Sequence, residues 1–263
     1  MLKSPATLTA LLALTSGTAS SQALFGTQYT VFDEARPGDL ALLDIDQDGD
    51  LDLAVCTSPW DMYTVENLGN GQFGAPTVLE RINVFQDPRG IEIADLDGDG
   101  LDDIACAANS SARVSWWRSN GDGTFSIERR FGTLNRPLDV ATGDVDLDGD
   151  IDVVVSSTTV NTFRFFENEG GGTFSTGADP PGINGSVYGI ALGLIDGDSF
   201  PDLISCTNRS PGVYWSRGNG DGTFEMPQPV SGATGDASQP VIADLNGDGW
   251  NDVVATFFTA QSV

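Results

Sequence analysis

The chain has 263 residues, of which 38 are acidic and 12 basic, so its formal net charge at pH 7 is −26. This balance argues against nucleic acid as a partner, because no basic surface can form to contact phosphates. Histidine is absent, which argues against zinc enzymes and Ser-His-Asp hydrolases. Hydrophobic residues make up 40% of the chain and include 14 Phe and 5 Trp, so we expect a packed core and not a disordered acidic tail.

The N-terminus resembles a secretory signal, and we assign residues 1–23 to a signal peptide. Lys3 precedes the short apolar run "LTALLAL" at 8–14, and the small residues of "TSGTASSQA" offer cleavage positions between Ala19 and Ala23. No later run is long and apolar enough to span a bilayer. We therefore expect a protein that is secreted or at the cell surface.

Two motifs recur together along the rest of the chain. An aspartate-rich motif, such as "DLDGDGLDD", starts at Asp44, Asp95, Asp144 and Asp244, and a degenerate copy starts at Leu194. A Gly-Phe motif follows in phase, with Phe73, Phe125, Phe174 and Phe224. The period is about 50 residues, which is typical of solenoids, propellers and arrays.

Each unit reads as four short strands. The segments that flank the acidic motif are almost wholly apolar, as expected for strands buried on both faces, whereas the outer segments alternate and carry aromatic residues. No stretch has a helical period. The fold class is therefore all-β, a β-propeller of four-stranded blades with about five blade repeats.

The propeller spans residues 24–263, with blades near 37–84, 85–135, 136–184 and 185–235 and a partial blade at 236–263. Residues 24–32 read as an N-terminal closing strand for the last blade. Because the last blade would still lack its third strand, we expect a fragment of a longer propeller, the alternative being a small ring with an imperfect fifth blade.

The acidic motifs predict four calcium sites. Carboxylates at positions 1, 3 and 5 of a loop can turn toward one centre, position 6 is a glycine that permits a sharp turn, position 7 offers a backbone carbonyl and position 9 adds a carboxylate. By position 1, 3, 5, 7 and 9, the predicted ligands are Asp44, Asp46, Asp48, Asp50 and Asp52; Asp95, Asp97, Asp99, Leu101 and Asp103; Asp144, Asp146, Asp148, Asp150 and Asp152; and Asp244, Asn246, Asp248, Trp250 and Asp252.

These loops differ from EF-hands, which need a glutamate at position 12 and flanking helices. Magnesium fits less well, because it prefers to keep several waters. Together the acidic motifs hold more than half of the 38 acidic residues, and without a cation their carboxylates would repel one another. The degenerate fourth loop is a weak fifth site. It has Leu194 at position 1 and Ser199 in place of the glycine, and keeps Asp196, Asp198 and Asp202.

The chain has three cysteines, each in a strand that follows an acidic loop: Cys56, Cys106 and Cys206. We expect buried free thiols. Cys56 and Cys106 follow the last loop aspartate by four and three residues, which points them to opposite faces of their sheets, so a disulfide between neighbouring repeats stays an alternative.

These motifs resemble the FG-GAP/VCBS repeat family, the β-propeller type of integrin α-subunits. "FGAP" at 73–76 matches the name-giving motif, the D-x-D-x-D-G-x-x-D loops look like the family's calcium sites, and Asn246 departs from them by replacing one aspartate. The resemblance covers nearly all of residues 24–263. It implies a secreted or cell-surface propeller, integrin-α-like, with calcium on one rim and a role in cell adhesion or in protein or carbohydrate binding.

Three functions remain open at this point. The first is an extracellular adhesion or ligand-binding module in which calcium is mainly structural, with a protein or glycan as partner and further blades or domains after it. The second is a lectin-like sugar binder that uses the aromatic residues of "SWW" at 115–117, of "YW" at 214–215, or Trp60, although packing between blades is the simpler explanation for these residues. The third is a polysaccharide-acting enzyme, and since no paired catalytic carboxylates or nucleophile motif is recognisable we predict a non-enzyme.

Overall fold

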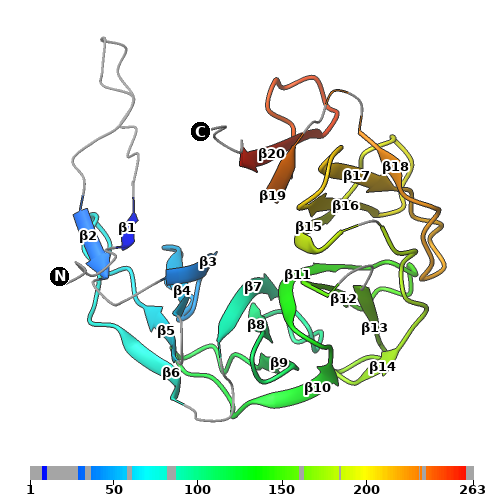
Figure 1. Cartoon of the computed structure of the whole chain (residues 1–263). Helices are drawn as coiled ribbons and strands as arrows, with labels where there is room; N and C mark the ends of the chain where they lie inside the picture. Colours follow the sequence, from blue (N-terminus) through cyan, green and yellow to red (C-terminus); the bar gives the residue numbers. More distant parts are fainter. Residues whose placement is uncertain are drawn as a thin grey trace.

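The computed structural model of the chain describes residues 8–10, 29–32, 37–57, 61–81, 87–159, 163–183, 185–230, 232 and 235–258. Within them the secondary structure is all strand. Four four-stranded antiparallel sheets and a two-stranded sheet lie side by side in an arc, and a second two-stranded sheet lies near its N-terminal end (Figure 1). The predicted all-β propeller of four-stranded blades is confirmed, and the arc is open between β3 and β19 (Figure 1).

Each blade is a meander in which consecutive strands pair. The strands are, blade by blade, β3 (Pro37–Leu43), β4 (Asp52–Thr57), β5 (Asp61–Val65) and β6 (Thr77–Arg81); β7 (Pro88–Ala94), β8 (Asp103–Ala108), β9 (Arg113–Trp117) and β10 (Arg129–Thr133); β11 (Pro137–Gly143), β12 (Asp152–Ser157), β13 (Phe163–Asn168) and β14 (Phe174–Thr176); β15 (Val187–Gly193), β16 (Asp202–Thr207), β17 (Val213–Ser216) and β18 (Gln228–Pro229); and β19 (Asp236–Ala243) and β20 (Asp252–Phe258).

The N-terminal strands form a sheet of their own. β1 (Leu8–Ala10) pairs with β2 (Tyr29–Phe32), the described part of the predicted closing strand 24–32. In this structure β2 does not close the last blade. A closing fourth strand needs a third strand to pair with, and among the described residues the last sheet holds only β19 and β20. Most of the predicted signal peptide lies outside the described residues and stays a prediction.

The core lies between blades. The second strand of each of the first four blades is buried at every residue, so these strands pack on both faces, as their apolar runs predict. Separate apolar clusters fill the joints between successive blades, and the bulkiest side chains in them include Trp116, Trp117 and Phe165. Trp116 and Trp117 are 1% and 0% exposed, so packing accounts for the aromatic pair at 116–117.

The inner strands of neighbouring blades contact each other in two ways, and the two kinds of contact alternate from blade to blade. Each inner strand begins with a register shift, a β-bulge, near its first residues. In the first blade the Asp39 carboxylate beside this bulge accepts a hydrogen bond from the Ile91 amide of the second blade at 3.2 Å, and in the third blade Asp139 accepts one from the Ile190 amide of the fourth at 2.8 Å.

The second and fourth blades carry Gly90 and Gly189 at the same place. The next blade comes so close there that a Cβ on Gly90 would lie 2.6 Å from the Asp139 Cα atom, and one on Gly189 would lie 2.7 Å from the Gln239 amide nitrogen. An aspartate hydrogen bond to the next blade thus alternates with a glycine that the next blade approaches closely. At this position the pattern repeats every two blades and not every blade.

Candidate metal centres on one rim

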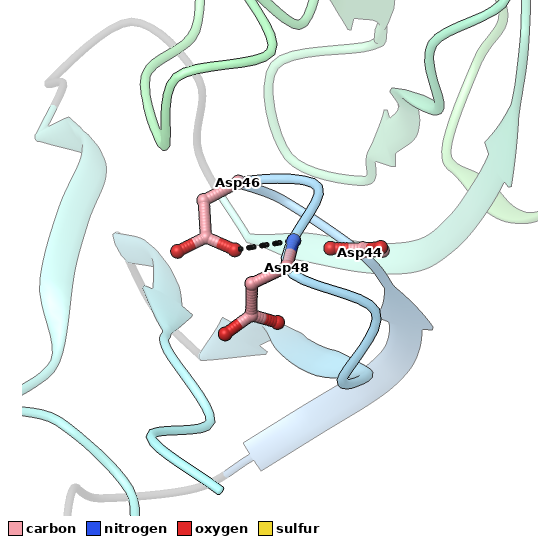
Figure 2. Close-up of side chains that lie close together, drawn as sticks. All are labelled: Asp44, Asp46 and Asp48. Carbon is pink, nitrogen blue, oxygen red and sulfur yellow. Dashed lines mark hydrogen bonds between the residues drawn. The ribbon is translucent and has the colours of Figure 1, made fainter.

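All five acidic loops lie on the same rim of the arc. Each joins the first strand of its blade to the second, so the inner strands all run toward this rim. Figure 2 shows the first loop, where Asp44, Asp46 and Asp48 come from one tight turn and the Asp48 amide donates a hydrogen bond to Asp46 at 3.2 Å. A glycine at position 6, such as Gly149 with φ +100°, supplies the left-handed backbone that the turn requires.

Three of the five loops bring carboxylate oxygens within 4.8 Å of one another. These groups are Asp44, Asp46 and Asp48 in the first blade, Asp95, Asp97 and Asp99 in the second, and Asp144, Asp146 and Asp152 in the third. Close carboxylates with oxygen donors only are the ligand set that hard cations prefer. Among the described residues, the acidic side chains of the fourth and fifth loops form no such group of three. At positions 1, 3 and 5 these loops hold only two carboxylates each, Asp196 and Asp198 in the fourth and Asp244 and Asp248 in the fifth.

The first-position aspartates separate the loops into two kinds. In the first and third blades, Oδ2 of Asp44 and of Asp144 accepts a hydrogen bond from the glycine at position 6. The other oxygen, Oδ1, is buried in both residues and has no hydrogen-bond partner among the described residues. A buried carboxylate oxygen without a partner is costly, so a cation bound in either of these loops could relieve that cost.

In the second and fifth blades the same position is already satisfied. Asp95 accepts backbone hydrogen bonds on both oxygens, from residues 98, 99 and 100. Asp244 does the same with residues 247, 248 and 249, and these backbone hydrogen bonds, chiefly the one from Gly249, lower its pKa. The backbone turn of these loops therefore replaces part of the charge compensation that a cation would give.

The aspartate at position 9 is a structural clamp in every blade. It is the first residue of the second strand, and in the first four blades its two oxygens accept one backbone amide from loop position 2 and one from the end of the third strand. The pairs are Ile45 and Asn67 for Asp52, Leu96 and Ser119 for Asp103, Val145 and Asn168 for Asp152, and Ile195 and Gly218 for Asp202. Asp252 accepts the Leu245 amide.

Burial raises the pKa of this aspartate in each of the first four blades. Desolvation raises the pKa of Asp103 and of Asp152 to about 7, against the hydrogen bonds that lower it, and the nearby loop carboxylates raise it further. A cation in the loop would reverse this, because it favours the ionised carboxylate. The sequence predicted position 9 as a metal ligand, which stays a prediction; the role that the structure shows is to tie the loop to the segment at the end of the third strand.

An arginine or a glutamate stands beside each of the first four loops, and the sequence interpretation missed this position. It directly follows the third strand in the first, second and fourth blades and is the penultimate residue of that strand in the third, and it is occupied, in blade order, by Glu66, Arg118, Glu167 and Arg217. The alternation of negative and positive side chains at a period of about 50 residues was visible in the sequence, but it stands outside the acidic motif and carries no motif of its own.

The two arginines occupy the acidic loops of their own blades. Arg118 donates to Asp97 and Asp99, both at 2.5 Å, so its guanidinium bridges positions 3 and 5. Arg217 contacts the equivalent Asp196 and Asp198, both at 2.7 Å. Hydrogen bonds with these carboxylates raise the pKa of both guanidinium groups. In the second and fourth blades an internal cation therefore neutralises the carboxylates.

The glutamates act in the opposite sense. Desolvation and then the neighbouring Asp146 carboxylate raise the pKa of Glu167, so the third loop gains a further acidic group instead of a counter-charge. Glu66 stands at the equivalent exposed place of the first blade. The second and fourth blades therefore have an arginine at this position, and the first and third have a glutamate. This is the same two-blade alternation as that of glycine and aspartate in the inner strands.

A second acidic cluster lies away from the loops, around an open cavity of about 660 Å³ that the inner strands line. Asp39, Glu92 and Asp139 line it. Burial raises the pKa of all three, that of Glu92 to about 7. The Asp39 charge adds to the rise at Glu92, and the charges of Asp39 and Glu92 add to the rise at Asp139.

Glu92 should therefore make the metal-free protein less stable as the pH rises. Between about pH 4.5 and 7 the folded chain keeps this proton and the unfolded chain releases it, so the free energy of unfolding falls across that window. Glu92→Gln should reduce the fall by on the order of 2 kcal/mol, as measured by urea unfolding in EDTA at pH 5 and pH 8. An unchanged pH dependence would contradict the assignment.

The comparisons with known proteins agree with this architecture. The FG-GAP-like repeat family matches the chain four times, over residues 44–106, 95–155, 144–205 and 195–255. This chain belongs to the FG-GAP-like repeat family. Each match of this FG-GAP chain runs from one acidic loop through the next, so the family unit includes the joint between two blades. A search of curated protein sequences found no match.

Solved structures place the FG-GAP chain among propellers. A lectin from Agrocybe aegerita that recognises non-reducing terminal N-acetylglucosamine matches with a TM-score of 0.65 and 20% identity, over 90% of this chain and 67% of the lectin. A gluconolactonase from Xanthomonas campestris, XC5397, matches with a TM-score of 0.52 and 18% identity, over 81% of this chain and 68% of that one. At these identities the likeness concerns the fold alone. Among the described residues no helix is long and apolar enough to cross a membrane.

Proposed function

We propose that this FG-GAP chain is a secreted calcium-binding β-propeller that serves as an extracellular adhesion or ligand-binding module, with calcium in a structural role. The observation that carries the calcium part is the pair of buried Oδ1 atoms of Asp44 and Asp144, which find no hydrogen-bond partner among the described residues. Calcium takes six to eight oxygen ligands, and these atoms, the neighbouring loop carboxylates and water can supply them.

The proposal distinguishes between the loops. The first and third would hold calcium tightly, through Asp44, Asp46 and Asp48 and through Asp144, Asp146 and Asp148, with the position-7 carbonyls of Asp50 and Asp150 completing the shell. The second and fifth would bind more weakly, because backbone amides satisfy their first aspartates and Arg118 occupies the second. The fourth, with Leu194 at position 1 and Arg217 between its carboxylates, would bind none.

Thermal unfolding in EDTA and in millimolar calcium tests this function. A ligand at a hundredfold excess over its dissociation constant stabilises the native state by about 2.7 kcal/mol per site, so we expect calcium to raise the Tm by roughly 10 °C. Magnesium at the same concentration should raise it less. An equal Tm in EDTA and calcium would rule out a structural calcium.

Freeing the second loop from its arginine should create a tighter calcium site. Arg118→Gln removes the cation between Asp97 and Asp99, so the chain should lose stability in EDTA through carboxylate repulsion and gain more stability from calcium than the unmodified protein. Calorimetric titration with calcium measures the added site.

Arg217→Gln is the matched control. It exposes the same pair of carboxylates, Asp196 and Asp198, but Leu194 supplies no first ligand, so no site should appear. Calcium binding that rises equally in both variants, or in neither, would show that the arginines do not govern metal binding.

Glycan binding is the second candidate function. A cavity of about 400 Å³ opens on the face opposite the acidic loops and is lined by Arg89, Asn109, Arg136, Leu138, Thr158, Ser186 and Tyr188. It combines an exposed aromatic ring with exposed guanidinium groups in a chain that is otherwise strongly acidic. The propeller lectin among the structural neighbours gives this candidate its fold precedent.

An array of neutral and acidic glycans tests the second candidate, with Arg136→Ala to locate the site. Binding of acidic glycans that the variant loses, at unchanged Tm, would support it. Binding of a protein ligand with no glycan bound would favour the adhesion module instead. Catalysis stays outside the proposal, because the gluconolactonase shares only the fold with this chain.

A further inference from the structure

Two buried cysteines face each other across the joint between the first two blades. Cys56 lies in β4 and Cys106 in β8, and their Sγ atoms are 3.6 Å apart. Both residues are 0% exposed and belong to one apolar cluster, together with side chains such as Met62 and Trp117. The contact between the two thiols is therefore part of the packed core between the two blades and does not involve surface loops.

The position of the two residues in their strands explains why they meet. Cys56 is the fourth residue after the clamp Asp52, and Cys106 is the third after Asp103. Successive residues of a strand point to opposite faces of the sheet, so the fourth residue of one blade faces forward and the third residue of the next faces back. The same pairing of positions recurs at every joint between the described blades.

The other joints show what these positions otherwise hold. Ala107 and Val155 share the cluster between the second and third blades, and Cys206 and Ala255 share the one between the fourth and fifth. Ser156 and Ser205, both buried, occupy the equivalent positions of the third and fourth blades. Among these four joints only the first places a thiol on both sides.

We propose that Cys56 and Cys106 form a disulfide that fastens the first blade to the second. The two thiols give up two protons and two electrons to an oxidant of the disulfide class, such as oxidised glutathione or a thiol–disulfide oxidoreductase. The protein S–S bond forms as the oxidant's S–S bond breaks, and the reduced oxidant is released as two thiols. Formation needs the sulfur atoms to approach from 3.6 Å to about 2.05 Å, a movement within the reach of side-chain rotation and a small shift between sheets.

The burial of the pair determines when the bond forms. Desolvation raises the pKa of the Cys106 thiol well above its ordinary value, and the thiolate is the attacking species. Exchange is therefore slow once the joint has packed and fast while the blades are still docking. An oxidising compartment, which the proposed secretion would provide, gives the chain this opportunity during folding.

Thiol counting on the whole chain tests the proposal. The protein is refolded with a mixture of reduced and oxidised glutathione, quenched with acid, unfolded without reductant and labelled with a maleimide, and labels are counted by intact mass spectrometry. We expect one label, on Cys206, and a linked peptide pair containing Cys56 and Cys106. Three labels, a mixed disulfide with glutathione on either residue, or a link to Cys206 would overturn the proposal.

Ala255→Cys provides a matched control, because it places a second thiol opposite Cys206 at the position equivalent to Cys106. This variant should carry no label after the same treatment, whereas a variant that links Cys206 but leaves Cys56 and Cys106 labelled would overturn the proposal. Reductant should also lower the Tm of the unmodified chain by several degrees and leave that of Cys56→Ala unchanged.

Discussion

Replacing Asp202 with alanine should lower the free energy of unfolding in EDTA by about 3 kcal/mol. Its carboxylate accepts the Ile195 amide at 3.1 Å and the Gly218 amide at 2.9 Å, and the residue is fully buried. Alanine would leave two amide donors without a partner at the junction of the loop and the third strand. The fourth loop is the place to measure this, because Arg217 neutralises its other carboxylates, Asp196 and Asp198.

Two substitutions in the same loop control for this result. Asp202→Asn keeps one acceptor oxygen and should lose about half as much stability. Asp198→Ala removes a half-buried partner of Arg217 near the surface and should cost less than about 1 kcal/mol. Urea unfolding of the three variants measures the order. An effect of Asp198→Ala as large as that of Asp202→Ala would contradict the clamp.

Asp144→Asn should remove one tight calcium site and on the order of half of the stabilisation by calcium. The asparagine oxygen can still accept the Gly149 amide, so the turn survives. The amide NH2 group then takes the place of the buried Oδ1 atom, and because NH2 cannot bind a cation the proposed site loses a charged ligand. In EDTA the variant should be as stable as the unmodified chain or slightly more stable, because repulsion from Asp146 and Asp148 falls.

Asp95→Asn is the matched control, because it tests whether the unpartnered oxygen of Asp144 is what makes the third loop bind calcium tightly. Asp95 holds the same loop position, but its oxygens already accept backbone amides and the neighbouring carboxylates already hold Arg118. Its effect on calcium-dependent Tm should be small. Equal losses for Asp95→Asn and Asp144→Asn would show that the loops bind alike and that the unpartnered oxygen has no special role.

The fold was predictable because one physical pattern repeats. Buried strands, acidic turns and Gly-Phe turns alternate at a fixed period, which leaves few architectures that bury both faces of each second strand. The four-stranded antiparallel sheets confirm the predicted fold class. The closing strand was harder to predict. A short isolated strand such as β2 pairs according to which edges are available, and the 24–32 segment does not encode which edge that is.

The sequence located the loops but not their differences. The first and second loops have nearly the same sequence. The unpartnered oxygen of Asp44 nevertheless depends on the backbone path of its turn, and Arg118 reaches the second loop from the end of a different strand. The role of Asp152 as a clamp depends likewise on the end of β13, sixteen residues further on. Local spacing carries none of this, because it depends on which segments the blade brings together.

Calcium stoichiometry most directly tests the central claim that the first and third blades hold the tight sites and that Arg118 and Arg217 neutralise the second and fourth. Calorimetric titration of the metal-free chain should give two tight sites, and the Asp44→Asn/Asp144→Asn double variant should lose both. Four equivalent sites in the unmodified chain, or tight binding that persists in the double variant, would contradict the account.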